Sequence, residues 1–360
     1  MSNTILLTGG GTAGHVTPNL ALIPRLKADG WDVHYVGSIN GIEKELIAEV
    51  PDVPYHAISS GKLRRYLDLK NLSDPFRVLK GFFQSLKLIR KLKPRVIFSK
   101  GGFVGVPLVW AAGLKRVPVV VHESDITPGL ANKLAVPVAR RVCTTFPEAA
   151  KAVGAKGLCT GSPIRPSLFE GDRAKGLEFA GLSGTRPVLL IMGGSLGAQA
   201  INAAVDRCID RLLAEYEIIH LRGKGALNPD LAGRESYAQY EFVSRELADL
   251  MAAADLILSR AGANAIWEFA ALHKPMLLIP LPLSASRGDQ VLNTKSFVKL
   301  GYARDLDQDT MTDEDLVKAL AAAWADKDAM IEAMQRDNAR GSLDRLQAEI
   351  YKAAGYTPEK

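Results

Sequence analysis

The chain has 360 residues, of which 47% are hydrophobic and 23% are charged, and its formal net charge is +6. This length suits two domains of ordinary size with real hydrophobic cores, and the composition excludes a disordered chain. The positive charge favours an anionic partner: nucleotide phosphates, nucleic acid or an acidic membrane surface.

The cysteine content and the apolar runs bear on where the protein works. Cys143, Cys159 and Cys208 are widely spaced and form no C-x-x-C pair, so a reducing cytosol fits better than a disulfide framework or a zinc site. The N-terminus enters an apolar run within four residues, and we expect no signal peptide. The longest nearly uncharged apolar stretch, residues 103–114, is too short to span a bilayer.

Short apolar runs alternate with amphipathic helical patterns along the chain. This alternation predicts α/β domains with parallel sheets and helices on both faces. The predicted strands are residues 4–8, 32–37, 95–99, 117–122, 187–192, 216–221, 255–259 and 275–280.

Two internal similarities indicate that one order of elements occurs twice. The strand, glycine turn and helix of TILLTGGGTAGHVTPNLALIPRL, from Thr4, resemble PVLLIMGGSLGAQAINAAVDRC, from Pro187, and residues 95–121 more weakly resemble residues 255–279. We predict two Rossmann-like, doubly wound domains that face each other across a cleft. The predicted domains are residues 1–162 and 163–342, with a C-terminal helix over about 343–360 that packs back on the first.

The first glycine turn, ILLTGGGTAGH at residues 5–15, matches G-x-G-x-x-G. A glycine turn that enters a helix presents free N–H groups and the positive end of a helix dipole, so it attracts phosphate. A dinucleotide site also needs an acid at the end of the second strand, which here ends in Gly37-Ser38, and this disfavours an NAD(P) oxidoreductase. His15 follows the last glycine and is either a base for an attacking hydroxyl or a cap of the helix.

The second half of the chain contains three candidate contacts with a nucleotide or a sugar. Ser195, in the second glycine turn, could donate to a phosphate, although the turn could also be structural. Glu268 could accept both ribose hydroxyls, unless it is a solvated helix residue. Asp289, Gln290 and Asn293 could bind sugar hydroxyls, or could simply begin a helix.

A cluster of polar residues follows the strand predicted over residues 117–122. His122, Glu123 and Asp125 lie before the turn Pro128-Gly129. A metal site is conceivable there, but no further ligands follow at a suitable spacing, and we predict none.

Residues 60–95 hold eleven Lys or Arg against two acids, with apolar residues at helical spacing. A basic amphipathic helix with exposed aromatic side chains suits an anionic membrane surface, and an ordinary helix packed on the sheet is the alternative. Nucleic acid is not expected, because no recognised binding motif accompanies the charge. The predicted membrane-facing residues are Phe76, Lys80, Phe82, Phe83 and Lys87.

Seven segments in order closely resemble the MurG family of bacterial UDP-N-acetylglucosamine transferases, in glycosyltransferase family 28. They are GGGTAGHVTPNLALIPRL, KGGFVGVPLVWAA, HESDITPGLANKLA, GSPIRPSL, GGSLGAQAIN, SRAGANAIWEFAALHKPMLLIPLP and SRGDQVLN. The resemblance covers nearly the whole chain. It implies a GT-B fold and an inverting, metal-independent transfer of GlcNAc from UDP-GlcNAc to the undecaprenyl-diphosphate-linked MurNAc-pentapeptide (lipid I), which gives lipid II. It implies no cofactor.

The resemblance also implies roles for single residues. His15 becomes the candidate catalytic base, with Glu123 and Asp125 as weaker candidates. Ser195 would contact the donor diphosphate, Glu268 the ribose and the backbone near Val243 the uracil. The implied substrate-binding residues are Thr12, Ala13, Gly14, Asp125, Arg165, Ser195, Val243, Ala263, Asn264, Ala265, Ile266, Trp267, Glu268, Asp289 and Gln290.

Three positions depart from the family pattern. Ala13 stands where the loop often has glycine, Asp125 replaces an asparagine that contacts donor in some members, and Asp289-Gln290 replaces a Gln-Gln pair. The first predicted domain would take the acceptor and the second UDP-GlcNAc.

The implied location is the cytoplasmic face of the bacterial membrane, as a peripheral protein. Other cell-wall synthesis or division proteins are candidate partners. Alternatives are a lipid glycosyltransferase with another acceptor, a UDP-GlcNAc 2-epimerase or a nucleotide-sugar-binding scaffold.

Overall fold

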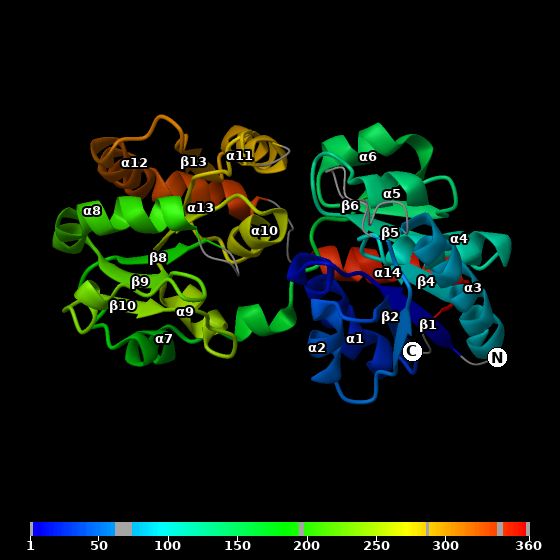
Figure 1. Ribbon diagram of the computed structural model, residues 1–360. Coiled ribbons are helices and arrows are strands. Elements are labelled where there is room, and N and C mark those ends of the chain that lie inside the picture. The colour runs from blue at the N-terminus through cyan, green and yellow to red at the C-terminus, as the bar shows by residue number, and fades with distance from the viewer. Residues whose placement is uncertain (1–2, 62–73, 194–197, 286–287, 337–340, 358–360) are drawn as a thin grey trace. The chain divides into compact units, whose positions relative to one another are not determined.

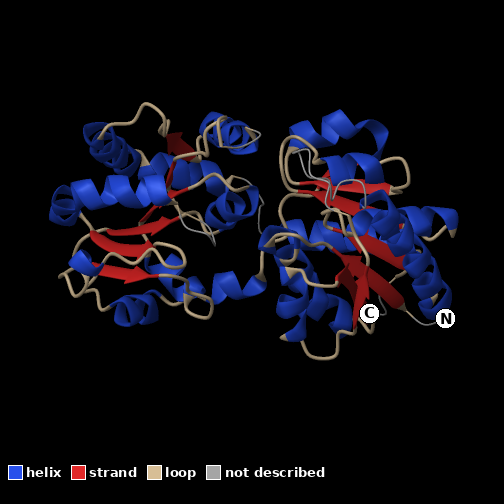
Figure 2. Cartoon of the chain, in the orientation of Figure 1, coloured by secondary structure: helices blue, strands red, loops and turns tan. Residues whose placement is uncertain are grey.

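The computed structural model describes residues 3–61, 74–193, 198–285, 288–336 and 341–357. The chain divides into two compact units: unit 1, Met1–Arg165 with Arg340–Lys360, and unit 2, Pro166–Ala339. Each unit has a parallel sheet with helices packed against it (Figure 1). Strands and helices alternate along each unit, as the sequence predicts (Figure 2).

The sheet of unit 1 has, within the described residues, seven parallel strands in the order β3-β2-β1-β4-β5-β6-β7. Because every strand runs the same way, all their carboxyl ends meet at one edge of the sheet, where ligands of such folds bind. The strands are β1 (Thr4–Thr8), β2 (Asp32–Ser38), β3 (Tyr55–Ile58), β4 (Val96–Ser99), β5 (Val119–Glu123), β6 (Arg141–Thr144) and β7 (Gly157–Cys159).

Helices cover both faces of this sheet because successive strand residues point to opposite sides. Ile5 and Leu7 belong to one core cluster, with side chains of α1, α2 and α14, whereas Leu6 belongs to another, with α3 and α4. The helices are α1 (Thr17–Ala28), α2 (Ile42–Ala48), α3 (Asp74–Leu92), α4 (Gly105–Leu114), α5 (Leu130–Ala135), α6 (Pro147–Val153) and α14 (Ser342–Ala354).

The last helix, α14, belongs to unit 1 although it follows all of unit 2 in sequence. Leu346 and Ile350 are fully buried in the core cluster that contains Ile5. At its surface, Arg141 Nε donates to Glu349 Oε2 over 3.0 Å. The ring of Tyr351 stacks on Trp31 with centroids 5.6 Å apart.

The sheet of unit 2 has, in the part of the chain described, six parallel strands in the order β10-β9-β8-β11-β12-β13. They are β8 (Val188–Met192), β9 (Glu217–Leu221), β10 (Tyr237–Tyr240), β11 (Leu256–Ser259), β12 (Met276–Leu278) and β13 (Ala303–Asp305). The helices are α7 (Arg173–Ala180), α8 (Gln199–Glu215), α9 (Leu247–Ala253), α10 (Ala263–Ala271), α11 (Asp289–Leu300), α12 (Asp313–Ala325) and α13 (Lys327–Gln335).

The predicted α/β class with doubly wound parallel sheets is confirmed. All eight predicted strands are present within about two residues of their predicted ends. Sequence reasoning missed β3, β6, β7, β10 and β13, which lie at or next to sheet edges. None of the described helices is both long and apolar enough to cross a membrane.

Candidate functional site

Two glycine loops at the carboxyl edge of unit 1 pack backbone against backbone. A Cβ atom on Gly102, after β4, would lie 2.4 Å from the Gly10 carbonyl oxygen, and one on Gly9 would lie 2.3 Å from that of His15. Gly11 and Gly102 also have φ angles of +88° and +83°, which side chains rarely allow. Only glycine fits these positions, so the loops after β1 and β4 form one continuous backbone surface.

A buried carboxylate anchors the glycine loop that follows β1. Glu43, in the first turn of α2, accepts from the Gly11 N–H over 3.2 Å and from the Ser38 N–H and Oγ over 3.0 and 2.6 Å. Burial raises the pKa of Glu43, but these hydrogen bonds outweigh burial and leave the pKa below its usual value. The strand β2 itself ends without an acid, as the sequence analysis states, but the Glu43 carboxylate reaches its last residue from α2. Even so, the oxygens of Glu43 bind backbone and Ser38, so they are not offered to a ribose.

His15 closes a one-turn 3-10 helix, Ala13–His15, that leads into α1. Its Nδ1 lies 3.0 Å from Oγ1 of the exposed Thr12, and Gly14 beside it is half-buried. Burial, followed by the charge of Lys100, lowers the pKa of His15 to about 4. The imidazole is therefore uncharged at neutral pH, as a proton acceptor must be. Val16, not His15, occupies the N-cap of α1.

Glu123 ends β5 and anchors the loop that follows. It is only 5% exposed, and it accepts from the N–H groups of Asp125 and Gly129 over 3.0 and 2.9 Å and from Asn132 Nδ2 over 2.9 Å. Because its two carboxylate oxygens accept three hydrogen bonds from this loop, Glu123 anchors the loop. The same hydrogen bonds occupy the oxygens that a catalytic base would use, so they count against Glu123 in that role. Asp125 is half-buried in the anchored loop.

His122, next to Glu123, is completely buried, and its Nε2 lies 3.0 Å from the carbonyl oxygen of Gly161. Burial, with Lys100 second, keeps its pKa well below the usual range. Across the described residues, no group of three or more His, Cys, Asp or Glu could hold a metal ion.

Sequence reasoning missed Lys100, the residue after β4. Its side chain is 1% exposed, and its Nζ donates to Ser124 Oγ. Burial lowers its pKa to about 8, while Glu123 and Asp125 oppose that shift. The sequence offered one signal for Lys100, namely its position between a predicted strand and the pair Gly101-Gly102.

Several residues predicted for the donor belong to α10, which follows β11 of unit 2. Ser195 lies outside the described residues. In α10, Asn264, Ala265 and Glu268 are half-buried. Helical geometry places these three on one face, so their side chains could meet a ligand together.

The other α10 residues that were predicted to bind substrate have buried side chains. Ala263, Ile266 and Trp267 are at most 6% exposed, and the Trp267 ring packs edge-on against Phe297 with centroids 5.1 Å apart. Their side chains belong to the core of unit 2, so direct side-chain contact with a substrate is not supported. Only their backbone could take part.

At the start of α11, the side chains of Gln290 and Asn293 form hydrogen bonds within unit 2. Gln290 Oε1 accepts from the Leu281 N–H over 2.9 Å, which fixes this side chain under the preceding loop, and Asp289 is half-buried. Asn293 is fully buried and donates to the Ala261 carbonyl over 3.1 Å, so the predicted sugar contact at Asn293 was wrong.

Two further predicted donor contacts lie elsewhere in the chain. Val243 is 6% exposed, so its side chain is buried and only its backbone could contact a ligand. Arg165 is half-buried and is the last residue of the first segment of unit 1.

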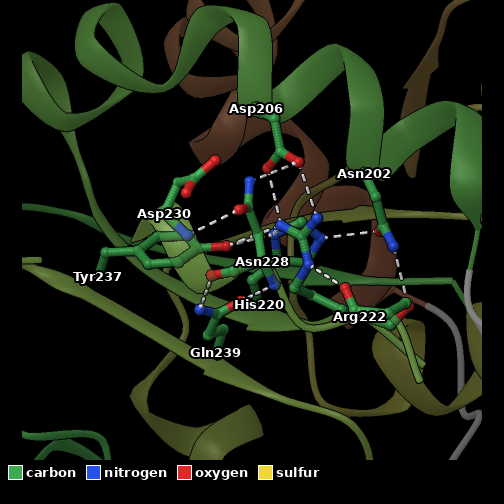
Figure 3. Close-up of polar contacts among 9 residues, drawn as sticks. Asn202, Asp206, His220, Arg222, Asn228, Asp230, Tyr237 and Gln239 are labelled. Atoms are coloured by element: carbon green, nitrogen blue, oxygen red, sulfur yellow. Dashed lines mark hydrogen bonds and ion pairs between the residues drawn. The ribbon is translucent and has the colours of Figure 1, made fainter. Parts of the chain in front are cut away.

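A second buried polar cluster, after β9, has a structural role. Arg222 binds both carboxylate oxygens of Asp206 over 2.7 and 2.8 Å and donates to Tyr237 OH over 3.1 Å (Figure 3). Asn202, His220 and Asn228 complete the network. Because these groups bind one another, the cluster stabilises the end of β9 and presents no free reactive group.

An apolar pocket of about 630 Å³ lies between α3 and α4 of unit 1. Leu79 and Phe82 of α3, and Phe103 and Trp110 on the α4 side, are among its lining residues. Phe103 directly follows Gly102, so the pocket begins one residue beyond the paired glycine loops.

Outside this pocket, Phe76 and Phe83 are 75% and 60% exposed, and Lys80 and Lys87 are exposed beside them. Phe82 is half-buried because it lines the pocket. Leu86 and Ile89 of the same helix are buried in the core. The helix therefore both packs on unit 1 and exposes aromatic side chains.

Comparisons with known proteins match both units. Residues 5–144 match the Glycosyltransferase family 28 N-terminal domain, and residues 188–349 match the Glycosyltransferase family 28 C-terminal domain. Each match spans the glycine loop and the carboxyl edge of one unit.

Two relatives that are about half identical in sequence to this chain carry the same name. The chain is 52% identical, over 97% of its length and 98% of the relative's, to a UDP-N-acetylglucosamine–N-acetylmuramyl-(pentapeptide) pyrophosphoryl-undecaprenol N-acetylglucosamine transferase of Clostridium botulinum strain Langeland. A relative of that name from Geobacillus kaustophilus is 51% identical, over 98% of this chain and 99% of its own. The crystal structure of Acinetobacter baumannii MurG superposes with a TM-score of 0.78 at 26% identity, over 97% of this chain and 99% of that one. The chain therefore belongs to the MurG family of glycosyltransferase family 28 and has the GT-B fold.

Proposed function

We propose that this protein transfers N-acetylglucosamine from UDP-GlcNAc to the 4-hydroxyl of MurNAc in lipid I and so makes lipid II for peptidoglycan. The observation that carries the proposal is the 52% identity to a transferase of that name over 97% of the chain. The paired glycine loops and the His15 site of unit 1 are consistent with a phosphate-bearing acceptor. Neither a different lipid acceptor nor a UDP-GlcNAc 2-epimerase is favoured by these relatives.

In the proposed reaction the acceptor binds to the first domain, residues 1–162 with the helix about 343–360. The MurNAc 4-oxygen forms a bond to the anomeric carbon of GlcNAc, the bond from that carbon to the UDP oxygen breaks, and UDP leaves with the electron pair. His15 takes the hydroxyl proton. A neutral imidazole suits this step, because it has the lone pair that takes the proton.

The donor UDP-GlcNAc binds to the second domain, residues 163–342, in this proposal. Glu268 accepts the ribose hydroxyls, and Asn264 and Ala265 on the same face of α10 lie beside the nucleotide. Gln290, fixed by Leu281, presents its amide nitrogen to GlcNAc hydroxyls next to Asp289.

Four further contacts complete the donor site. Ser195 and Arg165 meet the diphosphate, and the N-terminus of α8 stabilises the leaving charge. The backbone at Val243 binds the uracil. The proposal assigns no cofactor and no metal.

The exposed Phe76 and Phe83, with Lys80 and Lys87, are proposed to dock the protein peripherally on the anionic cytoplasmic face of the membrane, where a lipid-linked acceptor would lie. Phe82 contributes through the pocket wall. While docked on the membrane, the protein would also contact other cell-wall synthesis or division proteins.

The substrate assignment is tested by transfer to a lipid I analogue from UDP-GlcNAc, UDP-GalNAc or UDP-glucose. We expect UDP-GlcNAc to have the highest kcat/KM by at least about tenfold, because a sugar-reading site loses hydrogen bonds with the other two donors. Chromatography of the products is the measurement. Equal transfer from all three donors, or conversion of UDP-GlcNAc without an acceptor, would contradict the proposal.

The base assignment is tested with His15→Ala. Loss of a general base should lower kcat by roughly 10²–10⁴-fold. UDP-GlcNAc affinity, measured by calorimetric titration, should stay unchanged because the donor binds elsewhere. His56→Gln, on the edge strand β3, is the matched control and should keep normal turnover. Turnover of His15→Ala close to that of the control would rule out His15 as the base.

Membrane docking is tested with Phe76→Ser combined with Phe83→Ser. Burial of one phenylalanine contributes about 1.5–3 kcal/mol, so the double variant should bind phosphatidylglycerol vesicles at least about tenfold more weakly in co-sedimentation. Leu300→Ser, an exposed apolar residue of α11, is the control. Activity on a water-soluble acceptor analogue should not change. Vesicle binding equal to that of the control would refute the docking surface.

A further inference from the structure

The buried polar cluster after β9 lies between the strands of unit 2 that lead to the proposed donor contacts. β9 pairs with β8 on one side and with β10 on the other. Along the chain, β8 leads to α8, whose N-terminus is assigned to the diphosphate, and β10 leads to Val243, whose backbone is assigned to the uracil. The cluster thus joins the elements assigned to the two ends of one nucleotide.

Four side chains of this cluster form a closed ring of hydrogen bonds, and each is at most 6% exposed. Arg222 donates to Tyr237 OH over 3.1 Å, and that hydroxyl lies 3.0 Å from His220 Nδ1. His220 Nε2 lies 3.0 Å from Asn202 Oδ1, and Asn202 Nδ2 donates to the Arg222 carbonyl over 2.9 Å (Figure 3). Burial, followed by the charge of Arg222, lowers the pKa of His220 to about 3, so this ring has one N–H and one lone pair. With Tyr237 donating to Nδ1 and Nε2 donating to Asn202, each of these groups has a partner.

The Arg222 side chain connects three elements of unit 2. It binds both carboxylate oxygens of Asp206 in α8 over 2.7 and 2.8 Å, and it reaches Tyr237 in β10. Its Nε donates to the Ala226 carbonyl over 2.6 Å, which closes the turn after β9. A bidentate arginine–carboxylate pair has a fixed geometry, so these three elements are held at a set spacing.

The turn after β9 holds the residues that precede Val243. The Gly223 N–H donates to the Glu241 carbonyl over 3.1 Å, and the Gly225 N–H donates to Glu241 Oε1 over 2.9 Å. The two glycines have φ angles of +96° and +70°, which other residues rarely adopt. Because Glu241 lies two residues before Val243, the backbone at Val243 depends on this turn and so on Arg222.

The placement of that backbone bears on which base the donor site accepts. Uracil presents an acceptor oxygen at the position where cytosine presents an amino donor. A backbone contact distinguishes the two bases only if it is held in the correct place by the groups around it. A shift of the backbone at Val243 relative to α8 would therefore weaken the nucleotide and reduce the preference for uracil together.

We propose that Arg222 and Tyr237 are positioning residues for the donor: their ring of hydrogen bonds fixes the backbone before Val243 relative to the first turn of α8, and so sets the preference for uracil over cytosine. This inference rests on the proposed function, in which α8 meets the diphosphate and the Val243 backbone binds the uracil.

The experiment is calorimetric titration of the full chain with UDP and with CDP. Tyr237→Phe removes only the hydroxyl between Arg222 and His220 and leaves the ion pair with Asp206. The matched control is Tyr216→Phe, the same change at a buried tyrosine at the other end of β9. We expect Tyr237→Phe to weaken UDP binding by about three- to tenfold, the effect of one hydrogen bond, and to weaken CDP binding less. The control should keep the wild-type affinities.

A kinetic measurement separates positioning from a merely structural role. In Tyr237→Phe, the KM for UDP-GlcNAc should rise by the same factor while kcat stays within about twofold, because uniform donor binding is lost. A structural role alone would lower the free energy of unfolding in urea and leave the ratio of UDP to CDP affinity unchanged. Arg222→Lys, which keeps a positive charge but not the planar set of donors, should act in the same direction and carries the test if Tyr237→Phe does not fold.

Two results would overturn the inference in different ways. A ratio of UDP to CDP affinity in Tyr237→Phe equal to that of the Tyr216→Phe control, with UDP preferred by the wild type, would overturn the positioning role alone. Equal binding of UDP and CDP by the wild-type protein would contradict the proposed donor site itself, and the inference would fall with it.

Discussion

The site in unit 1 depends on how Glu43 and the glycines hold one loop. Three hydrogen-bond donors from Gly11 and Ser38 satisfy the two carboxylate oxygens of Glu43. The glycine loops after β1 and β4 then pack against each other without side chains between them. A residue larger than glycine at Gly10 would meet the Glu43 carboxylate at 2.5 Å. This contact places His15 and the start of α1 relative to β4 and β5.

The hydrogen bond between Gly11 and Glu43 also affects how the carboxyl edge of unit 1 could bind an anion. The Gly11 N–H, which a phosphate-binding turn would offer to its ligand, already donates to a carboxylate. Glu123 similarly uses the N–H groups of its own loop. The carboxyl edge of unit 1 therefore combines two carboxylates that backbone N–H groups hold in place with the buried Lys100, which donates to Ser124.

Much of the fold could be predicted from the sequence because central parallel strands are apolar on both faces. The runs that became β1, β4, β5 and β8 are of this kind. Edge strands such as β3 (YHAI) and β13 (ARD) lack that pattern, since only one side of each pairs and packs. Periodicity alone could not find them.

The site was predicted less completely than the fold, for physical reasons. His15 and Glu268 could be named as candidates from their place after a glycine turn. Glu43 could not, because it reaches the end of β2 from the following helix. Lys100 was missed despite the Gly-Gly pair that follows it, because lysine after a strand is usually solvent-exposed. Spacing also could not show that Ile266 and Trp267 face the core.

The proposed reaction requires that unit 1 binds the acceptor and unit 2 binds the donor. Hydrogen–deuterium exchange of the full chain with UDP-GlcNAc alone, or with a soluble lipid I analogue alone, tests it most directly. We expect UDP-GlcNAc to slow exchange at the starts of α10 and α11, and the acceptor analogue to slow it at residues 9–15 and 101–103. Protection of residues 9–15 by UDP-GlcNAc, with α10 and α11 unaffected, would contradict this division of substrates between the units.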